Sequence, residues 1–175
     1  METSRGSLTD AIKREARRLG FHSVGVCPAV TPPGIARFRQ WLERGYAGEM
    51  QYISDRAEAY EHPRHVMDGV RSLVMLTISY HTARPQPARP GEGRISRYAW
   101  GSTDYHDVIH AKLKDLASEL KQRAEGSRVR GVVDTAPLLE REFAQLAGLG
   151  WIGKNIAKCI IYILTNSNTH WNRGS

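Results

Sequence analysis

The stretch SLVMLTISY, residues 72–80, lies near the middle of the chain. It is rich in β-forming residues, and its apolar and polar positions alternate only weakly, which predicts a central strand of a sheet. Helical and strand patterns follow one another on both sides of it. This order favours an α/β or α+β domain in which a mixed sheet is flanked by helices.

On the N-terminal side of this strand, the pattern predicts a helix over residues 7–19 and a short buried strand over residues 23–27. The first helix carries its apolar residues on one face, at Leu8, Ile12, Ala16 and Leu19. A second helix is predicted over residues 35–45. A third, with a weaker pattern, is predicted over residues 48–60.

On the C-terminal side, residues 82–94 are rich in proline and glycine and predict a loop. Residues 105–124 have the strongest helical pattern of the chain, and Asp104 is placed to cap its start. The apolar stripe of this helix is assigned to Val108, Leu113, Leu116 and Leu120. A strand over residues 128–133 and a helix over residues 137–147 follow.

The length of 175 residues suits one domain. No apolar run is long enough to cross a bilayer, and the N-terminus lacks the apolar segment of a secretory signal. We therefore expect a cytoplasmic protein without a membrane partner. The only two cysteines, Cys27 and Cys159, are far apart in the sequence, which argues against a disulfide framework or an all-cysteine metal site.

The chain carries a formal net charge of +7. Excess arginine and lysine favours a polyanionic partner, of which nucleic acid is the obvious candidate. The simpler interpretation is that many of these cations cover solvated helix faces. Charge alone leaves both readings open.

One candidate ligand site is the stretch RISRYAWGSTDYH, residues 94–106, which lies between the loop and the strongest helix. Free backbone N–H groups at a helix start can bind polar ligand edges, and aromatic faces can line a flat cofactor. Alternatively, Tyr98, Trp100 and Tyr105 anchor the loop as core residues. His106 and His110 are four residues apart, but no third metal ligand is evident.

A second candidate is Asp134, at the C-terminal end of the strand predicted over residues 128–133. Ligands of α/β sheets tend to bind at that edge, and a desolvated carboxylate there can donate a proton near neutral pH. The alternative is that Asp134 or Thr135 caps the following helix. The glycine-rich segment AGLGWIGKN, residues 147–155, fits neither phosphate-loop spacing nor dinucleotide-loop spacing.

Three segments together resemble signature stretches of epoxyqueuosine reductases. They are ISRYAWGSTDYH (residues 95–106), VDTAPLLER (133–141) and AGLGWIGKN (147–155). The strand ending in GVCP, residues 25–28, is similar to the same family. Three separated motifs in the right order are more specific than any one of them. The resemblance extends over about residues 7–155.

The resemblance implies a cobalamin-dependent oxidoreductase that reduces the epoxide of epoxyqueuosine to the alkene of queuosine in certain tRNAs. It implies a nitroreductase-like domain over residues 1–155 that binds cobalamin and substrate. Residues 156–175 are then a divergent tail, which we expect to fray. The implied partner is tRNA that carries epoxyqueuosine.

The resemblance also implies roles for single residues. Asp134 matches the proton donor to the substrate oxygen. The implied pocket for cobalamin and substrate consists of Ser96, Arg97, Tyr98, Trp100, Gly101, Tyr105, His106 and Arg141. Ser96 departs from the pattern, since some relatives carry cysteine there.

The family continues past the GWIGKN-like stretch into a cysteine-rich segment that holds two [4Fe–4S] clusters. Here Cys159 is the only cysteine after Asn155, so the chain cannot ligate a cluster alone. We expect a reductase fragment or truncated form that needs an external electron donor. The alternatives are a cobalamin- or tRNA-binding module without independent catalysis, and a poorly folded remnant.

Overall fold

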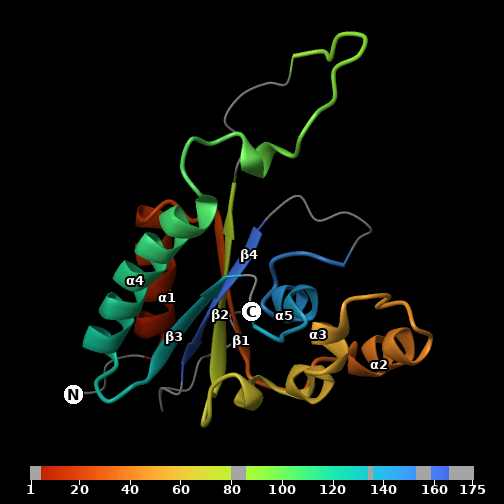
Figure 1. The fold of residues 1–175 in the computed structure, drawn as a ribbon. Coiled ribbons are helices and arrows are strands. Elements are labelled where there is room, and N and C mark those ends of the chain that lie inside the picture. The colour runs from red at the N-terminus through yellow and green to blue at the C-terminus, as the bar shows by residue number, and fades with distance from the viewer. Residues whose placement is uncertain (1–4, 80–85, 134–135, 153–158, 166–175) are drawn as a thin grey trace.

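The computed structural model describes residues 5–79, 86–133, 136–152 and 159–165. It contains a four-stranded sheet with helices on both faces (Figure 1). The strands are β1 (Ser23–Pro28), β2 (Ser72–Ile78), β3 (Val129–Val133) and β4 (Cys159–Thr165). The helices are α1 (Arg5–Arg18), α2 (Ile35–Glu43), α3 (Gln51–Ser54), α4 (Tyr105–Arg123) and α5 (Glu140–Leu146). Three short 3-10 helices are η1 (Ala57–Glu61), η2 (Pro63–His65) and η3 (Arg97–Ala99).

The strand order is β1-β2-β4-β3, and each neighbouring pair is antiparallel. The expectation of helices around a sheet is confirmed, but the expectation of a mixed sheet is wrong. The strands β2 and β3 run in the same direction, which the long connection through α4 allows. Because β4 lies between them and runs the opposite way, no two neighbours among the described strands are parallel.

The central strand β2 is buried on both faces, which explains its weak alternation in the sequence. Val74 and Leu76 pack into the core with α1 and α4. Leu73 and Met75 face the second core, whose centre is Phe143 of α5. The two helical layers therefore share one sheet, with α1 and α4 on one face and α5 on the other (Figure 1).

The helix α4 confirms the strongest sequence prediction, but one position of its apolar stripe is different. Ile109, rather than Val108, completes the buried row with Leu113, Leu116 and Leu120. Val108 is 42% exposed. The other three positions are spaced three or four residues apart, and Ile109, four residues before Leu113, continues that face where Val108 does not.

The predictions of a helix over residues 48–60 and of a helix from residue 137 are wrong. Gly48 has a φ of +56° and is followed by a single short turn, α3, and then by η1. The positive φ excludes Gly48 from a right-handed helix, and the non-helical backbone of Arg56, with a φ of −114° and a ψ of 16°, separates α3 from η1. The helix α5 begins only at Glu140, three residues later than predicted from Pro137.

The sheet extends past residue 155, the boundary expected between domain and tail. β4 lies in the interior of the sheet, where it pairs with β2 on one side and β3 on the other. The side chain of Thr165 is fully buried, and its carbonyl accepts a hydrogen bond from the backbone N–H of Arg71 at 2.9 Å. Within the described part of the chain, no helix is long and apolar enough to cross a membrane.

Candidate functional site

A cavity of about 500 Å³ lies on the face of the sheet covered by α5, between α2, η1 and the start of α5. Its lining combines apolar, aromatic and charged side chains. These are Gly34, Arg37, Phe38, Tyr60, Ala136, Leu138, Leu139, Glu140, Arg141, Glu142 and Ile152. A mixed lining of this kind is typical of a small-molecule site.

Aromatic rings form one wall of this cavity. The rings of Phe38 and Tyr60 lie 4.7 Å apart, and Phe38 also stacks on Trp41 with 6.2 Å between the ring centroids. Burial raises the pKa of the Tyr60 hydroxyl above its ordinary value, so this group stays protonated near neutral pH. The wall therefore offers flat apolar faces together with one protonated hydroxyl group.

An ion pair joins α2 to α5 at the rim of the cavity. Arg37 donates to the Glu142 carboxylate at 2.9 Å, although the arginine side chain is 76% exposed and the glutamate only 12%. Gly34 lies directly against this carboxylate, so a Cβ at that position would be 2.6 Å from Cδ of Glu142. A second cavity of about 680 Å³ shares Arg37, Glu142 and Ile152 with the first.

The stretch 96–106 lies away from this cavity, beyond the C-terminal end of β2 (Figure 1). Ser96 occupies the N-cap position of η3 without a side-chain capping hydrogen bond, and Trp100 donates from its ring N–H to the carbonyl of Ile95 at 3.1 Å. The guanidinium of Arg97 lies over the Trp100 ring, 5.9 Å from its centroid. Trp100 is 39% exposed, so the alternative that it anchors the loop as a core residue is wrong.

The start of α4 is organised by Asp104, as its sequence predicts. The carboxylate accepts from the backbone N–H of His106 at 2.9 Å and lies 2.8 Å from the ring Nδ1 of the same histidine. The pKa of Asp104 is lowered mainly by the hydrogen bond from the His106 backbone, and to a smaller extent by the one from the His106 ring. The rings of Tyr105 and His106 lie 3.9 Å apart. His106 is therefore oriented by local contacts, with part of its ring exposed.

The residues predicted for one pocket fall into two groups. One group belongs to the stretch beyond the C-terminal end of β2, and none of its members lines either described cavity. It consists of Ser96, Arg97, Trp100, Gly101, Tyr105 and His106. Arg141 lines the cavity beside α5. Asp134 and the side chain of Tyr98 lie outside the described residues. The structure thus brings Arg141 together with cavity residues that the sequence analysis did not select.

The missed cavity residues are Arg37, Phe38, Tyr60 and Glu142. Phe38 has the helical spacing of a core residue, which hid its place on the cavity wall. Arg37 and Glu142 are more than a hundred positions apart, so their pairing carries no local sequence signal. Among the residues that the structure describes, no group of three or more histidine, cysteine or acidic side chains is placed to hold a metal.

The family model, the curated relatives and the solved structures that match this chain all bear the name epoxyqueuosine reductase. A family model described as epoxyqueuosine reductase QueG, DUF1730, matches residues 61–135. The epoxyqueuosine reductase of Gloeobacter violaceus is 46% identical over 152 residues, which cover 86% of this chain and 46% of the relative. The chain spans about half the length of the curated relatives it matches.

Two solved structures share the fold. A selenomethionine-labelled epoxyqueuosine reductase has a TM-score of 0.79 and 24% identity, with 95% of this chain and 48% of that chain covered. An epoxyqueuosine reductase with a tRNA-Tyr epoxyqueuosine-modified stem loop has a TM-score of 0.77 and 23% identity. The match covers 95% of this chain and 47% of that one. At this identity the two likenesses establish the fold.

Proposed function

Because the chain is a relative of epoxyqueuosine reductases over about half of their length, we propose that it is the cobalamin- and substrate-binding part of such an enzyme. Its activity would be the reduction of epoxyqueuosine to queuosine in tRNA, with electrons from a separate donor. The observation that carries the proposal is the 46% identity to a named reductase, together with the shared fold.

The role proposed for Asp134 is to donate a proton to the substrate oxygen. It directly follows Val133, the last residue of β3, and Thr135 separates it from Ala136, which lines the cavity. A carboxylic acid that is desolvated beside a bound substrate can donate a proton near neutral pH. Arg141 supplies a cation to the same cavity.

The described residues fit one wall of a cobalamin site. A corrin ring is broad and flat with polar groups at its edge, and it needs an open surface that offers apolar contact and hydrogen bonds. The exposed stretch of Trp100 and Gly101, with the nearby imidazole of His106, has that character. When bound, cobalamin supplies a cobalt centre that can pass electrons to the epoxide.

The chain does not fit iron–sulfur clusters. A [4Fe–4S] cluster takes four cysteine ligands, whereas Cys27 and Cys159 are the only cysteines of this chain. Cys27 is buried and its thiol lies 3.6 Å from the carbonyl of Phe143, so it packs in the core. We therefore infer that residues outside this chain supply the electrons.

A tRNA partner is supported by charge and by a relative. The net charge of +7 suits a polyanion, and a relative of the same fold is solved with a modified tRNA stem loop. Arg89 and Arg94 are exposed and precede the stretch 96–106 in the sequence, and Arg97 belongs to that stretch. We infer that this edge of the sheet faces the tRNA.

The second candidate is a binding module that holds cobalamin or tRNA without turnover, and the small number of cysteines favours it. Reduction of an epoxyqueuosine-modified stem loop by the chain with cobalamin and a strong chemical reductant separates the two. The enzyme proposal expects queuosine to form and Asp134→Asn to abolish its formation. Binding without any product would support the module, and product at an unchanged rate in Asp134→Asn would overturn the proton-donor role.

A further inference from the structure

Arginine side chains gather at the end of the sheet where β2 and β3 begin. This end lies opposite the stretch 96–106, which is beyond the other end of β2 (Figure 1). Thr165 of β4 pairs with Ser72 of β2 and with Val129 of β3, so both strands start beside it. Because neighbouring strands lie about 4.8 Å apart, the two starts are about 10 Å apart. The exposed arginines at this end, called the basic patch below, are Arg64, Arg71, Arg128 and Arg130.

Two arginines of the basic patch are held by the turn between η2 and β2. Arg130 donates to the carbonyl of Val66 at 2.7 Å, and Arg128 donates to the carbonyl of Asp68 at 2.5 Å. Gly69 of the same turn lies against Arg128, since a Cβ there would be 3.2 Å from a guanidinium nitrogen. A backbone carbonyl carries no net charge, so these hydrogen bonds orient the two guanidinium groups without neutralising them.

An acidic neighbour offsets only part of the charge of the basic patch. The carboxylate of Asp68 is 98% exposed and lies 3.9 Å from the guanidinium of Arg128, whose side chain is 58% exposed. An ion pair between exposed groups at this distance is weak. Arg64 in η2 and Arg71, the residue before β2, add two further exposed cations. Among Asp68 and the arginines of the patch, positive charge therefore remains in excess.

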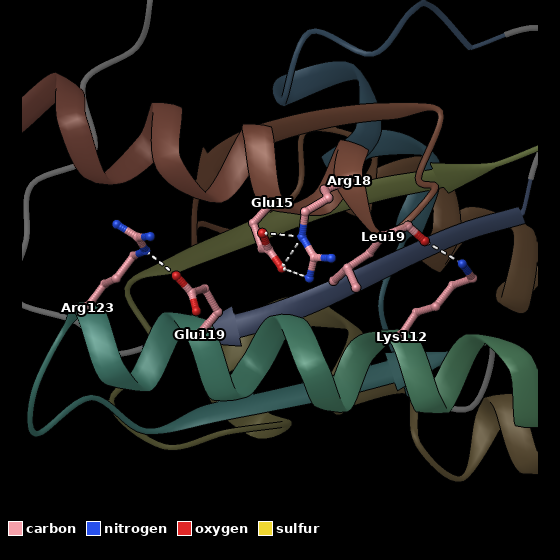
Figure 2. Close-up of polar contacts among 6 residues, drawn as sticks. All are labelled: Glu15, Arg18, Leu19, Lys112, Glu119 and Arg123. Atoms are coloured by element: carbon pink, nitrogen blue, oxygen red, sulfur yellow. Dashed lines mark hydrogen bonds and ion pairs between the residues drawn. The ribbon is translucent and has the colours of Figure 1, made fainter.

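The arginines of the α1–α4 layer have a different environment. On α1, Arg18 pairs with the carboxylate of Glu15 at 2.6 Å. On α4, Arg123 pairs with the carboxylate of Glu119 at 2.5 Å. Figure 2 shows both pairs between the two helices. Each of these arginines is balanced by a carboxylate of its own helix, so this layer supplies matched controls for the basic patch.

An oriented guanidinium group is well suited to phosphate. Its planar N–H groups can donate two parallel hydrogen bonds to one phosphate, which a lysine ammonium cannot do. A membrane surface would instead favour exposed apolar side chains that insert among the lipids. Within residues 61–71 and 127–131, no large apolar side chain is exposed. We propose that the basic patch binds the phosphate backbone of RNA, at the end of the sheet opposite the stretch 96–106.

The choice of RNA among polyanions rests on the proposed function, in which the substrate is a tRNA. Contacts to phosphate carry no direct information about base sequence, so the basic patch should bind RNA whether or not it contains epoxyqueuosine. Such binding requires neither cobalamin nor reduction. A measurement of binding can therefore fail while reduction succeeds, and reduction can fail while binding succeeds.

The test compares two double variants of the full chain that lose the same charge. One combines Arg128→Gln with Arg130→Gln and removes the oriented guanidinium groups. The other combines Arg18→Gln with Arg123→Gln and removes the paired arginines of the α1–α4 layer. Binding of a fluorescently labelled tRNA transcript without modified bases is followed by anisotropy from about 50 to 200 mM salt. Thermal unfolding checks that each variant is folded.

The basic patch predicts a difference between these two variants. The variant with Arg128→Gln and Arg130→Gln should bind the transcript about tenfold more weakly at the lowest salt concentration. Its logarithmic dependence of the binding constant on salt should be shallower by about 2, with about 1 for each lost phosphate contact. The control variant should keep a slope close to that of the wild type. If the first variant does not fold, Arg64→Gln with Arg71→Gln takes its place, with the same expectation.

Three results would overturn the proposal. They are binding of the transcript by the wild type without salt dependence, an unchanged affinity in the patch variant, and an equal loss in the patch and control variants. Vesicles that contain phosphatidylserine form a second arm of the experiment. If the patch variant loses binding to these vesicles but keeps its binding to RNA, the patch belongs to a membrane surface and the proposal is wrong.

Discussion

Gly25 of β1 and Ala147, the residue after α5, lie in such close contact that a Cβ on Gly25 would be 2.8 Å from the Cβ of Ala147. This contact seats the end of α5 on the sheet and so positions the helix whose first turn lines the cavity. No other residue type fits on that face of β1 without displacing α5.

Gly25→Ala should therefore destabilise the protein by about 1–3 kcal/mol, because the added methyl group overlaps packed atoms. Gly93→Ala is the matched control, since a Cβ there meets no atom within 4 Å. The control should change the free energy of unfolding by about 0.5 kcal/mol or less. Urea unfolding of both variants measures the difference, and equal effects would show that the Gly25–Ala147 contact is not tight.

The contact between Gly34 and Glu142 predicts coupling between two positions on different helices. Gly34→Ala should cost about 1–3 kcal/mol, because its methyl group would overlap the carboxylate of Glu142. In a Glu142→Ala background that cost should largely disappear. A double-mutant cycle in urea measures the coupling, and additive effects within about 0.5 kcal/mol would contradict the contact.

The hydrogen bond from Lys112 to Leu19 predicts a specific link between α1 and α4. Lys112→Met keeps the apolar stem but removes the donor, so it should cost about 1 kcal/mol. Lys114→Met, on the exposed face of the same helix, is the control and should be nearly neutral. Thermal unfolding of the two variants compares them; a larger loss in the control would contradict the assigned contact.

Asp104 predicts a pH-dependent contribution to stability. Its pKa is lowered from 3.8 in the folded chain, so the ionised cap stabilises the fold above that value and loses its effect as pH falls through the lower folded pKa. Asparagine caps a helix but does not titrate here, so the stability difference between wild type and Asp104→Asn should shrink in strong acid. Thermal unfolding between neutral pH and strong acid checks this, and a constant difference would contradict it.

A comparison with Asp104→Ala separates charge from capping. Alanine accepts no hydrogen bond from His106, so this variant should be less stable than Asp104→Asn at neutral pH. If the two variants are equally stable there, the cap has no structural role.

The sequence was sufficient for the elements whose determinants are local. The cap at Asp104 and the rows of apolar residues in α1 and α4 depend on neighbours within one or two turns, and both helices form as predicted. The central place of β2 followed from its composition. Gly48 was misjudged because the helical pattern around it does not reveal its positive φ.

The remaining features depend on contacts between distant segments. The antiparallel order arises because β4 lies between β2 and β3, which no local pattern encodes. The cavity wall of Arg37, Phe38 and Glu142 forms only when α2 and α5 meet. The residues of the implied pocket were predicted from the family resemblance. In the structure, those that are described lie partly beyond the C-terminal end of β2 and partly at the cavity.

We propose that this chain is the cobalamin-binding part of an epoxyqueuosine reductase, and cobalamin binding tests this proposal. Its most direct test is a titration of the purified, folded chain with cobalamin, followed by the corrinoid absorption spectrum and by retention of cobalamin after dialysis. We expect a spectral change that saturates near one cobalamin per chain at micromolar concentrations. A chain that unfolds cooperatively, yet shows no spectral change and retains no cobalamin, would contradict it.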